Sequence, residues 1–320
     1  MNVRQRFDAA EYRLFRNPRP AWPLAIARIV IGVAIFGWAT TMLFDVTSLL
    51  GEDAVLPTDL ASERIRWITL DTATEIRFAL AALIVASLAI IGGWRPTVWL
   101  VIAFALMVTI QRRNPLILNS GDIILRDLTL LLALTPTGAA LSFDRFRRHG
   151  RDGLYTAGLV APWGMRLVQL QMMVVYLFAF WSKSGAEWRE GIAVSTALRL
   201  QDLQRFGQLD VLVENIWMVA ALTWGTLVVE LMLGTLLWYK PLRPLLIVLG
   251  VLLHFTIDMY LLVGFFGLAM IGGLMTFLDA DTIERAVRVR RERQQINRPE
   301  ADPTPDPDPG QESEPVGATT

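Results

Sequence analysis

Long apolar runs alternate with short polar stretches along most of the chain. A helix that crosses a lipid bilayer needs about 20 predominantly apolar residues, and several of the runs reach that length. Each should be helical, because lipid cannot satisfy free backbone groups and no alternating barrel strands occur. The predicted fold class is therefore an all-α polytopic membrane protein. About eight spans are expected, at roughly 23–44, 76–94, 97–111, 122–136, 165–182, 215–239, 243–260 and 262–279.

Basic residues indicate how these spans are oriented. With eight spans, four basic segments fall on one side of the membrane, and the excess of Lys and Arg in short cytoplasmic loops predicts that this side, with both termini, is cytoplasmic. Arg112 and Arg113 fall on the outer side and indicate either an anion-binding pocket or a miscounted span. The four segments are the N-terminal one with Arg4, Arg6, Arg13, Arg16 and Arg19, the one with Arg145, Arg147, Arg148 and Arg151, the turn with Lys240 and Arg243, and the arginine-rich stretch after residue 279.

The same pattern divides the chain into three regions. Residues 1–21 form a basic cytoplasmic segment, residues 22–279 the transmembrane domain, and residues 280–320 a cytoplasmic tail. The tail is expected to be largely disordered, because its end is rich in Pro, Asp, Glu and Gly and has almost nothing to bury.

Composition narrows the range of functions. The chain is 53% hydrophobic and 19% charged, a balance shifted from soluble domains toward lipid, which is its expected surroundings. It has no cysteine, which excludes disulfides, iron–sulfur clusters and thiol catalysis, and its two histidines are too few to favour a His-rich metal site. A net charge of zero gives no case for nucleic-acid binding. We therefore expect neither a metal nor a nucleic-acid partner.

Three charged residues inside the predicted spans are expected to be structural, because a charge in lipid is costly unless it is paired or functional. Arg28 either extends to the inner interface or pairs with Glu230 or Asp127. Asp127 follows Arg126 directly, so the two should face different directions and need separate partners. Glu230 lies in the middle of its span, where a structural pair or proton handling would explain it.

Polar pairs near the outer ends of two spans are candidates for a binding site. Asn119 and Asp122 open the fourth span, where they either cap its first turn or help its free amides to hold an anion. His254 and Asp258 are four residues apart and share one helix face. The histidine is either a hydrogen-bonded packing residue or a proton carrier.

Lys183 ends the fifth span, close to Trp188. A lysine at a tryptophan-lined interface is commonly an anchor for the helix end. The alternative is a catalytic base, which has to be uncharged at neutral pH and therefore shielded from water. The residues themselves leave both interpretations open.

Six short motifs, in order along the chain, resemble the HTTM (horizontally transferred transmembrane), or vitamin K-dependent γ-carboxylase-like, superfamily. Together they run from about residue 22 to residue 279. The motifs are RIVIG at 28–32, GEDAVLP at 51–57, IIGGW at 90–94, LNSGD at 118–122, KSGAEWREG at 183–191, and LLHFTIDMYLLVGFF at 252–266, where His254 is followed by Gly264 and Phe266 with the family's spacing.

The resemblance implies a catalytic site in a cavity that faces out of the cell membrane. In the animal carboxylase the lysine that matches Lys183 deprotonates reduced vitamin K and so starts the reaction that carboxylates a glutamate. Lys183 would accept the proton here, His254 would assist, and the cofactor would be reduced vitamin K or another, menaquinol-like quinol. The cavity residues would be Asn119, Asp122, Trp188, Arg112, Arg113, Tyr176 and Asp258.

The chain also departs from the carboxylase pattern. Ser120 stands where the carboxylase has a histidine, and no β-rich domain follows the membrane part. Its length is similar to that of a bacterial branch that includes the sporulation-delaying-protein B family, whose members help to mature a secreted peptide with a partner protein. A non-carboxylating factor for a secreted peptide is therefore the alternative function. A proton-coupled carrier that uses Glu230, His254 and Asp258 is the third.

Overall fold

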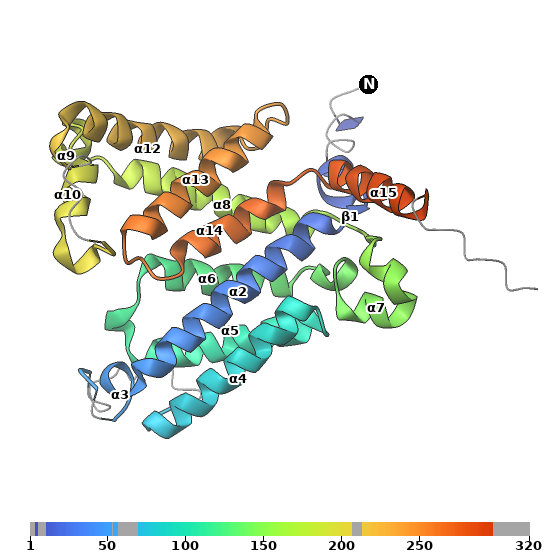
Figure 1. Ribbon diagram of the computed structural model, residues 1–320, viewed down its shortest axis with the longest axis horizontal. Coiled ribbons are helices and arrows are strands. Elements are labelled where there is room, and N and C mark those ends of the chain that lie inside the picture. The colour runs from blue at the N-terminus through green and yellow to red at the C-terminus, as the bar shows by residue number, and fades with distance from the viewer. Residues whose placement is uncertain (1–3, 6–10, 53, 57–69, 207–212, 297–320) are drawn as a thin grey trace, which may run out of the picture.

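A computed structural model of the chain describes residues 4–5, 11–52, 54–56, 70–206 and 213–296 (Figure 1). The fold is all-α, as predicted, and the only strands among these residues are the two-residue β1 (Arg19–Pro20) and β2 (Leu159–Val160). A helix occupies each predicted span. These helices are α2 (Trp22–Phe44), α4 (Ala73–Gly92), α5 (Pro96–Arg113), α6 (Ser120–Ala133), α8 (Trp163–Ser182), α12 (Ile216–Leu236), α13 (Arg243–Tyr260) and α14 (Phe266–Leu274).

Five of these helices, α2, α4, α8, α12 and α13, are long and apolar enough to cross a membrane. A sixth span is possible through α14, which continues to Phe277 and bends by 84° into α15 (Ala280–Ile296). By contrast, α6 has 14 residues and so a length of only about 21 Å against a hydrocarbon core of about 30 Å. The multi-pass membrane fold is thus confirmed, whereas eight complete crossings stay a prediction.

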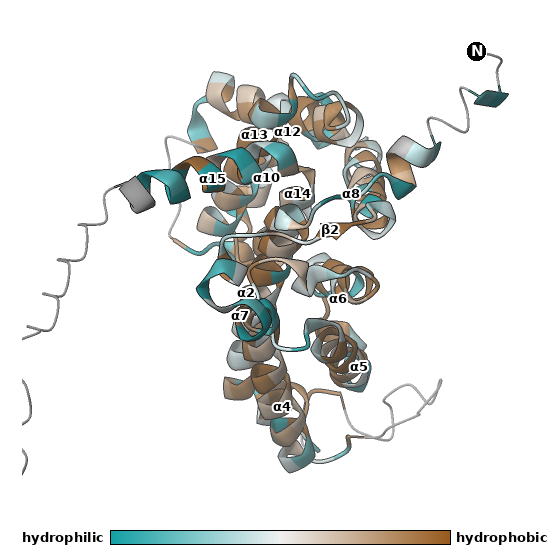
Figure 2. Ribbon diagram, turned by 90° about the vertical axis from the view of Figure 1, so that its right-hand side faces the viewer, coloured by the Kyte–Doolittle hydropathy of each residue, from teal (hydrophilic) through white to brown (hydrophobic). Residues whose placement is uncertain are grey.

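The connecting segments gather at two opposite ends of the helices (Figure 1). One end, here called the outer end, carries α3 (Val46–Leu49), α9 (Ala186–Arg189) and α10 (Ala193–Arg199). The other, here called the basic end, carries β1, β2, α7 (Phe143–His149) and α15. Figure 2 shows α7 and α15 as largely hydrophilic and α4 and α5 as largely hydrophobic.

Contacts between distant segments hold the basic end together. Arg19 lies 3.3 Å from Asp281 and Arg291 lies 2.5 Å from Asp152. In addition, β1 pairs antiparallel with β2. These contacts place three segments at the same end of the helix bundle, as the distribution of basic residues predicts. They are the N-terminal segment, the segment after α6 and the segment after α14. Which side of the membrane this end faces stays a prediction.

The centre of the molecule is α2, which packs against α4, α6 and α14 (Figure 1). Small residues let these helices approach closely, as is common where helices cross in membranes. A Cβ atom on Gly32 would lie 2.7 Å from Ile91 Cγ1, and one on Gly272 would lie 2.7 Å from Ile31 Cδ1. Larger residues at either glycine would push the helices apart.

Arg28 is fully buried and does not pair with Glu230 or Asp127, so the predicted charge pair was wrong, while its extension to the inner interface stays a prediction. Its guanidinium donates to the backbone oxygens of Thr137 at 2.7 Å and Leu141 at 2.5 Å. Because α6 ends at Ala133, the turn that follows has carbonyl groups without helical partners. The planar, forked guanidinium satisfies two of them at once.

One further expectation needs correction. Arg126 and Asp127 contact each other at 3.5 Å, although they are adjacent, and Arg126 also donates to Gln111 Oε1 at 3.0 Å. Neither residue therefore needs a distant charged partner. The first part of the predicted tail is helical, because α15 occupies Ala280–Ile296. Residues 297–320 lie outside the described residues.

Candidate functional site

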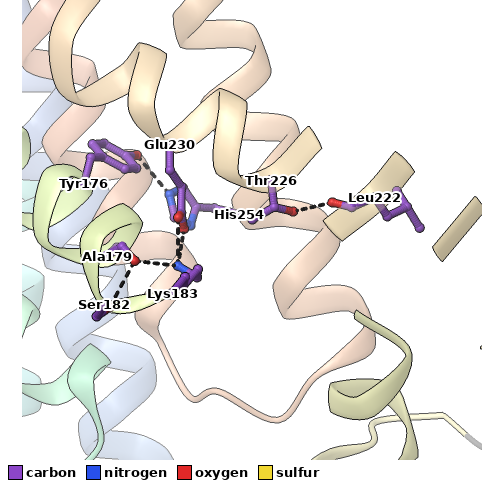
Figure 3. A network of polar contacts seen from close by, with 8 residues as sticks. All are labelled: Tyr176, Ala179, Ser182, Lys183, Leu222, Thr226, Glu230 and His254. Atoms are coloured by element: carbon purple, nitrogen blue, oxygen red, sulfur yellow. Dashed lines mark hydrogen bonds and ion pairs between the residues drawn. The ribbon is translucent and has the colours of Figure 1, made fainter. Parts of the chain in front are cut away.

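Lys183 lies at the C-terminal end of α8, where the helix ends on a backbone bond from its N–H to the Phe180 oxygen. Its Nζ atom donates to both carboxylate oxygens of Glu230, at 2.6 Å to Oε1 and 2.8 Å to Oε2 (Figure 3). The exposed fraction of the side chain is 23% for Lys183 and 9% for Glu230. The amine is therefore held in place and does not extend freely into water.

Glu230 thus belongs to the candidate site, whereas the sequence suggested a separate structural charge. Helices α8 and α12 come together closely one turn beyond Glu230, where a Cβ atom on Gly234 would lie 2.8 Å from Leu177 Cδ2. This approach places the carboxylate opposite the end of α8. The sequence held a usable signal, since an acid in the middle of a span needs a cation and Lys183 ends a neighbouring span.

Trp188 covers the amine from the short helix α9. The Lys183 Nζ atom lies 5.4 Å from the centroid of the indole ring, within the range of a cation–π contact. The backbone oxygen of Trp188 accepts from the indole N–H of Trp224 at 3.1 Å. Gly191 has a φ of +75°, and a Cβ there would lie 3.3 Å from Ala220 and from Trp224. The lysine–tryptophan–glycine spacing therefore folds a turn that returns Trp188 over Lys183 and docks on α12.

Tyr176 and His254 form the buried part of the site. Tyr176 precedes Lys183 by two helical turns and so lies on the same face of α8. Its hydroxyl is 2.9 Å from Nε2 of His254, and Phe266 packs edge-on against the imidazole with ring centroids 5.4 Å apart. The exposed fractions are 1% for Tyr176 and 3% for His254. Within the described part of the chain, the buried Nδ1 atom of His254 has no hydrogen-bond partner.

Figure 3 shows these side chains gathered between three helices: Tyr176 and Lys183 from α8, Glu230 from α12 and His254 from α13. With Trp188 they are called the lysine site below. The structure thus brings together both residues predicted to be catalytic, Lys183 and His254, and two of the predicted cavity residues.

Asn119 and Asp122 form a reciprocal capping box at the start of α6. Asn119 Oδ1 accepts from the Asp122 N–H at 3.1 Å, and Asp122 Oδ2 accepts from the Asn119 N–H at 3.0 Å. Asp122 also accepts from the indole N–H of Trp38 at 2.8 Å. Asn119 lies against the turn between α13 and α14, since a Cβ on Gly264 would be 3.1 Å from its Nδ2. These contacts explain both residues as helix caps, and none of them reaches Lys183.

Other predicted site residues also have structural contacts. Asp258 Oδ1 accepts from the Gly267 N–H at 3.2 Å and so holds the start of α14, although Asp258 shares a helix with His254. Arg113 donates to the backbone oxygens of Leu56 at 3.0 Å and Gly51 at 2.6 Å, which ties the segment after α3 to the end of α5. Arg112, the preceding residue, is exposed.

One predicted motif is described only in part, and the described residues include no candidate metal site. Asp53 and Pro57 of the GEDAVLP motif lie outside the described residues. Among the residues that the structure describes, no group of three or more His, Asp or Glu side chains could hold a metal ion.

A family model described as the HTTM domain matches residues 15–281. The chain belongs to the HTTM domain family. The predicted resemblance is thereby confirmed at the level of the family. No curated protein and no solved structure matches the chain.

The HTTM match extends from the segment before β1 to the start of α15, and so contains the whole lysine site. In this HTTM protein the site combines an amine, a carboxylate, an indole ring and a buried tyrosine–histidine pair. Such a set can hold a proton at a defined atom, shield it from water and present an aromatic surface to a flat ligand.

Proposed function

We propose that this HTTM protein is an integral membrane enzyme related to the γ-carboxylases, with Lys183 as the base in a cavity that faces outward. The substrate would be quinol-like or a peptide. The contact between Lys183 and Glu230 carries the proposal, because it holds the amine in position and provides a carboxylate that can accept its proton. The outward direction rests on the positive-inside rule, which assigns the basic end to the cytoplasm of the cell.

A protonated amine has to lose a proton before it can act as a base. In the lysine site the proton passes from Nζ of Lys183 to Oε1 of Glu230 along a contact of 2.6 Å. The ion pair becomes a neutral amine and a neutral carboxylic acid, so the pair has no net charge before or after the transfer. The free amine then accepts a proton from the substrate and becomes an ammonium. The resulting substrate anion and this ammonium stabilise each other in low dielectric, and the Trp188 ring adds a cation–π contact.

The residues of the lysine site fit a quinol such as reduced vitamin K or a menaquinol. Trp188 offers a flat aromatic surface, Lys183 a proton acceptor, and His254 a buried nitrogen that still lacks a hydrogen-bond partner within the described chain. When bound, a quinol supplies an acidic hydroxyl group and reducing electrons. The residues of the chain bind it, orient it, exclude water and take up its proton.

Two other functions remain as alternatives. A factor for the maturation or export of a secreted peptide, acting with a partner protein, would use the same cavity without quinol chemistry; Ser120 in place of a histidine favours it. A proton-coupled carrier would need a relay through Glu230, His254 and Asp258. That relay has less support, because the three side chains bond to three different partners, Lys183, Tyr176 and the Gly267 backbone.

Purified full-length protein in detergent tests the proposal. Mass spectrometry identifies co-purifying quinones, lipids and peptides, and chromatography follows the oxidation of added menaquinol under oxygen. Thr226→Val is the matched control, because Thr226 lies one turn before Glu230 and, within the described residues, its hydroxyl bonds only to its own helix, at Leu222. We expect turnover by wild type and by this control, and a loss of roughly 100-fold or more in Lys183→Ala.

Two outcomes would overturn this proposal. Turnover that survives in Lys183→Ala would remove the lysine as the base. A wild-type protein that neither holds a quinone nor oxidises menaquinol, and instead co-purifies with a peptide, would favour the peptide-maturation function.

A further inference from the structure

A pocket of about 250 Å³ lies at the basic end, far from the lysine site at the outer end (Figure 1). Arg95, from the turn between α4 and α5, lines it together with Asp144, Arg147 and Arg148 of α7. Sequence reasoning explained the arginines of α7 only as part of a cytoplasmic loop. A pocket lined by three arginines is suited to binding an anion.

The pocket has fixed walls because α7 is clamped to the turn between α4 and α5. Asp144 Oδ2 accepts from the backbone N–H of Arg95 at 2.8 Å, and the Asp144 N–H donates to the Gly93 oxygen at 3.4 Å. Gly93 has a φ of +71°, and a Cβ there would lie 2.6 Å from Cβ of Ser142. Only glycine permits this conformation and this approach without strain.

The pocket has a net positive charge, and its guanidinium groups can bind a ligand. Three guanidinium groups face one carboxylate, which is a net charge of 3 − 1 = +2. Within the described residues, no hydrogen bond or ion pair occupies the guanidinium groups of Arg95, Arg147 or Arg148. Arg145, on the same helix, differs, because it donates to Thr156 Oγ1 at 2.9 Å and to the Gly153 oxygen at 3.4 Å.

Exposed aromatic side chains are adjacent in the sequence to the residues that line the pocket. Trp94 precedes Arg95 and packs against Trp99 with ring centroids 5.6 Å apart. Phe143 and Phe146 of α7 are exposed and stack on each other at 6.3 Å. Exposed aromatic rings at the ends of membrane helices lie at the level of the lipid headgroups. The pocket therefore lies where a headgroup phosphate would be.

We infer that this pocket binds the phosphodiester headgroup of an anionic glycerophospholipid at the cytoplasmic face. The arginines would form charge-assisted hydrogen bonds to the phosphate oxygens, and the phenylalanine rings would contact the upper part of the acyl chains. This site is independent of the chemistry at Lys183.

Native mass spectrometry of the full-length protein in detergent, titrated with phosphatidylglycerol, tests the inference. Arg147→Gln/Arg148→Gln removes two charges from the pocket, and we expect roughly thirtyfold weaker binding. The control is Arg151→Gln/Arg290→Gln, which removes the same charge from exposed positions at the same end but outside the pocket lining. It should change binding by less than about threefold. Arg147→Lys/Arg148→Lys keeps the charge and should retain most of the affinity.

Three results would overturn the inference. An equal loss in both glutamine pairs would mean that general surface charge attracts the lipid. Binding of phosphatidylcholine as tight as that of phosphatidylglycerol would exclude selection for an anionic headgroup. Displacement of the lipid by an equal concentration of inorganic phosphate would assign the pocket to free phosphate.

Discussion

The Nζ atom of Lys183 lies within hydrogen-bond distance of both carboxylate oxygens of Glu230, at 2.6 Å and 2.8 Å. This contact joins the end of α8 to the middle of α12. The two charges are compensated by each other and by the indole ring of Trp188. Removing either partner should therefore have different consequences from removing both.

Glu230→Gln and Lys183→Met each leave one charge of the pair without its partner, half-buried on Lys183 or buried on Glu230. We expect each to lower the free energy of unfolding by about 1–3 kcal/mol, a value between those of exposed and fully buried pairs. The double variant Lys183→Met/Glu230→Gln should be more stable than either single variant, because no unpaired charge is left in lipid. Equilibrium unfolding in mixed micelles measures all three in a double-mutant cycle. Strictly additive losses would mean that the two side chains do not interact.

Gly191 and Gly185 lie in the same motif and provide a matched pair of substitutions. Gly191→Ala should lower stability by about 1–2 kcal/mol and displace Trp188, because φ is +75° and the new Cβ would meet Trp224. Gly185→Ala should have little effect, since nothing lies within 4 Å of its Cβ position. Turnover of menaquinol and thermal unfolding in detergent report both effects. Similar behaviour of the two variants would show that the turn does not need its left-handed residue.

Arg28→Lys should destabilise the protein although it keeps the charge. A single ammonium cannot bridge the Thr137 and Leu141 oxygens as the forked guanidinium does. We expect a loss of about 1–3 kcal/mol, the cost of one buried polar group left without a partner. Arg189→Lys, at an exposed position, serves as the control. Thermal unfolding in detergent makes the comparison, and equal midpoints would contradict the structural role of Arg28.

The start of α15 should be sensitive to acid. Hydrogen bonds from the hydroxyl and backbone N–H of Thr282 to Asp279 Oδ2 lower the pKa of Asp279 below its ordinary value of 3.8. A carboxylate with a lowered pKa stabilises the fold above the unfolded value, and this contribution is lost as the pH falls through the folded value.

Asp279→Asn should therefore lower the melting temperature at pH 7 relative to wild type, and the difference should shrink as the pH falls below the ordinary Asp value of 3.8. The exposed Glu292→Gln is the control at the other end of the helix. A difference that does not change as the pH falls would show that the Asp279 carboxylate does not stabilise the fold through its charge.

The helices that could be predicted from the sequence are those formed by long apolar runs. The helices α2, α4, α8, α12 and α13 coincide with predicted spans within a few residues, since runs of 18 or more apolar residues are defined by composition alone. The break between α13 and α14 was harder to place. Gly264 with its φ of +67° and the start of α14 at Phe266 depend on contacts with the side chains of Asn119, on another helix, and Asp258, and the hydropathy of the run does not reveal these contacts.

The site was predictable to a similar degree. The motif around Lys183 singled out a lysine that lies in the candidate site, and the i to i+4 spacing placed His254 and Asp258 on one helix. Their partners lie on other helices, so Tyr176 could not be paired with His254, nor Lys183 with Glu230, from spacing alone. Arg28 illustrates the same limit, because its partners are backbone oxygens, which any residue could provide.

The sequence by itself determined that this chain is a helical membrane protein of the HTTM family, because apolar length and short motifs are local properties of the chain. The tertiary structure alone decided which charges meet. Polar groups in lipid have to find partners wherever the packing of helices brings them, and that packing is set by contacts between residues far apart in the sequence.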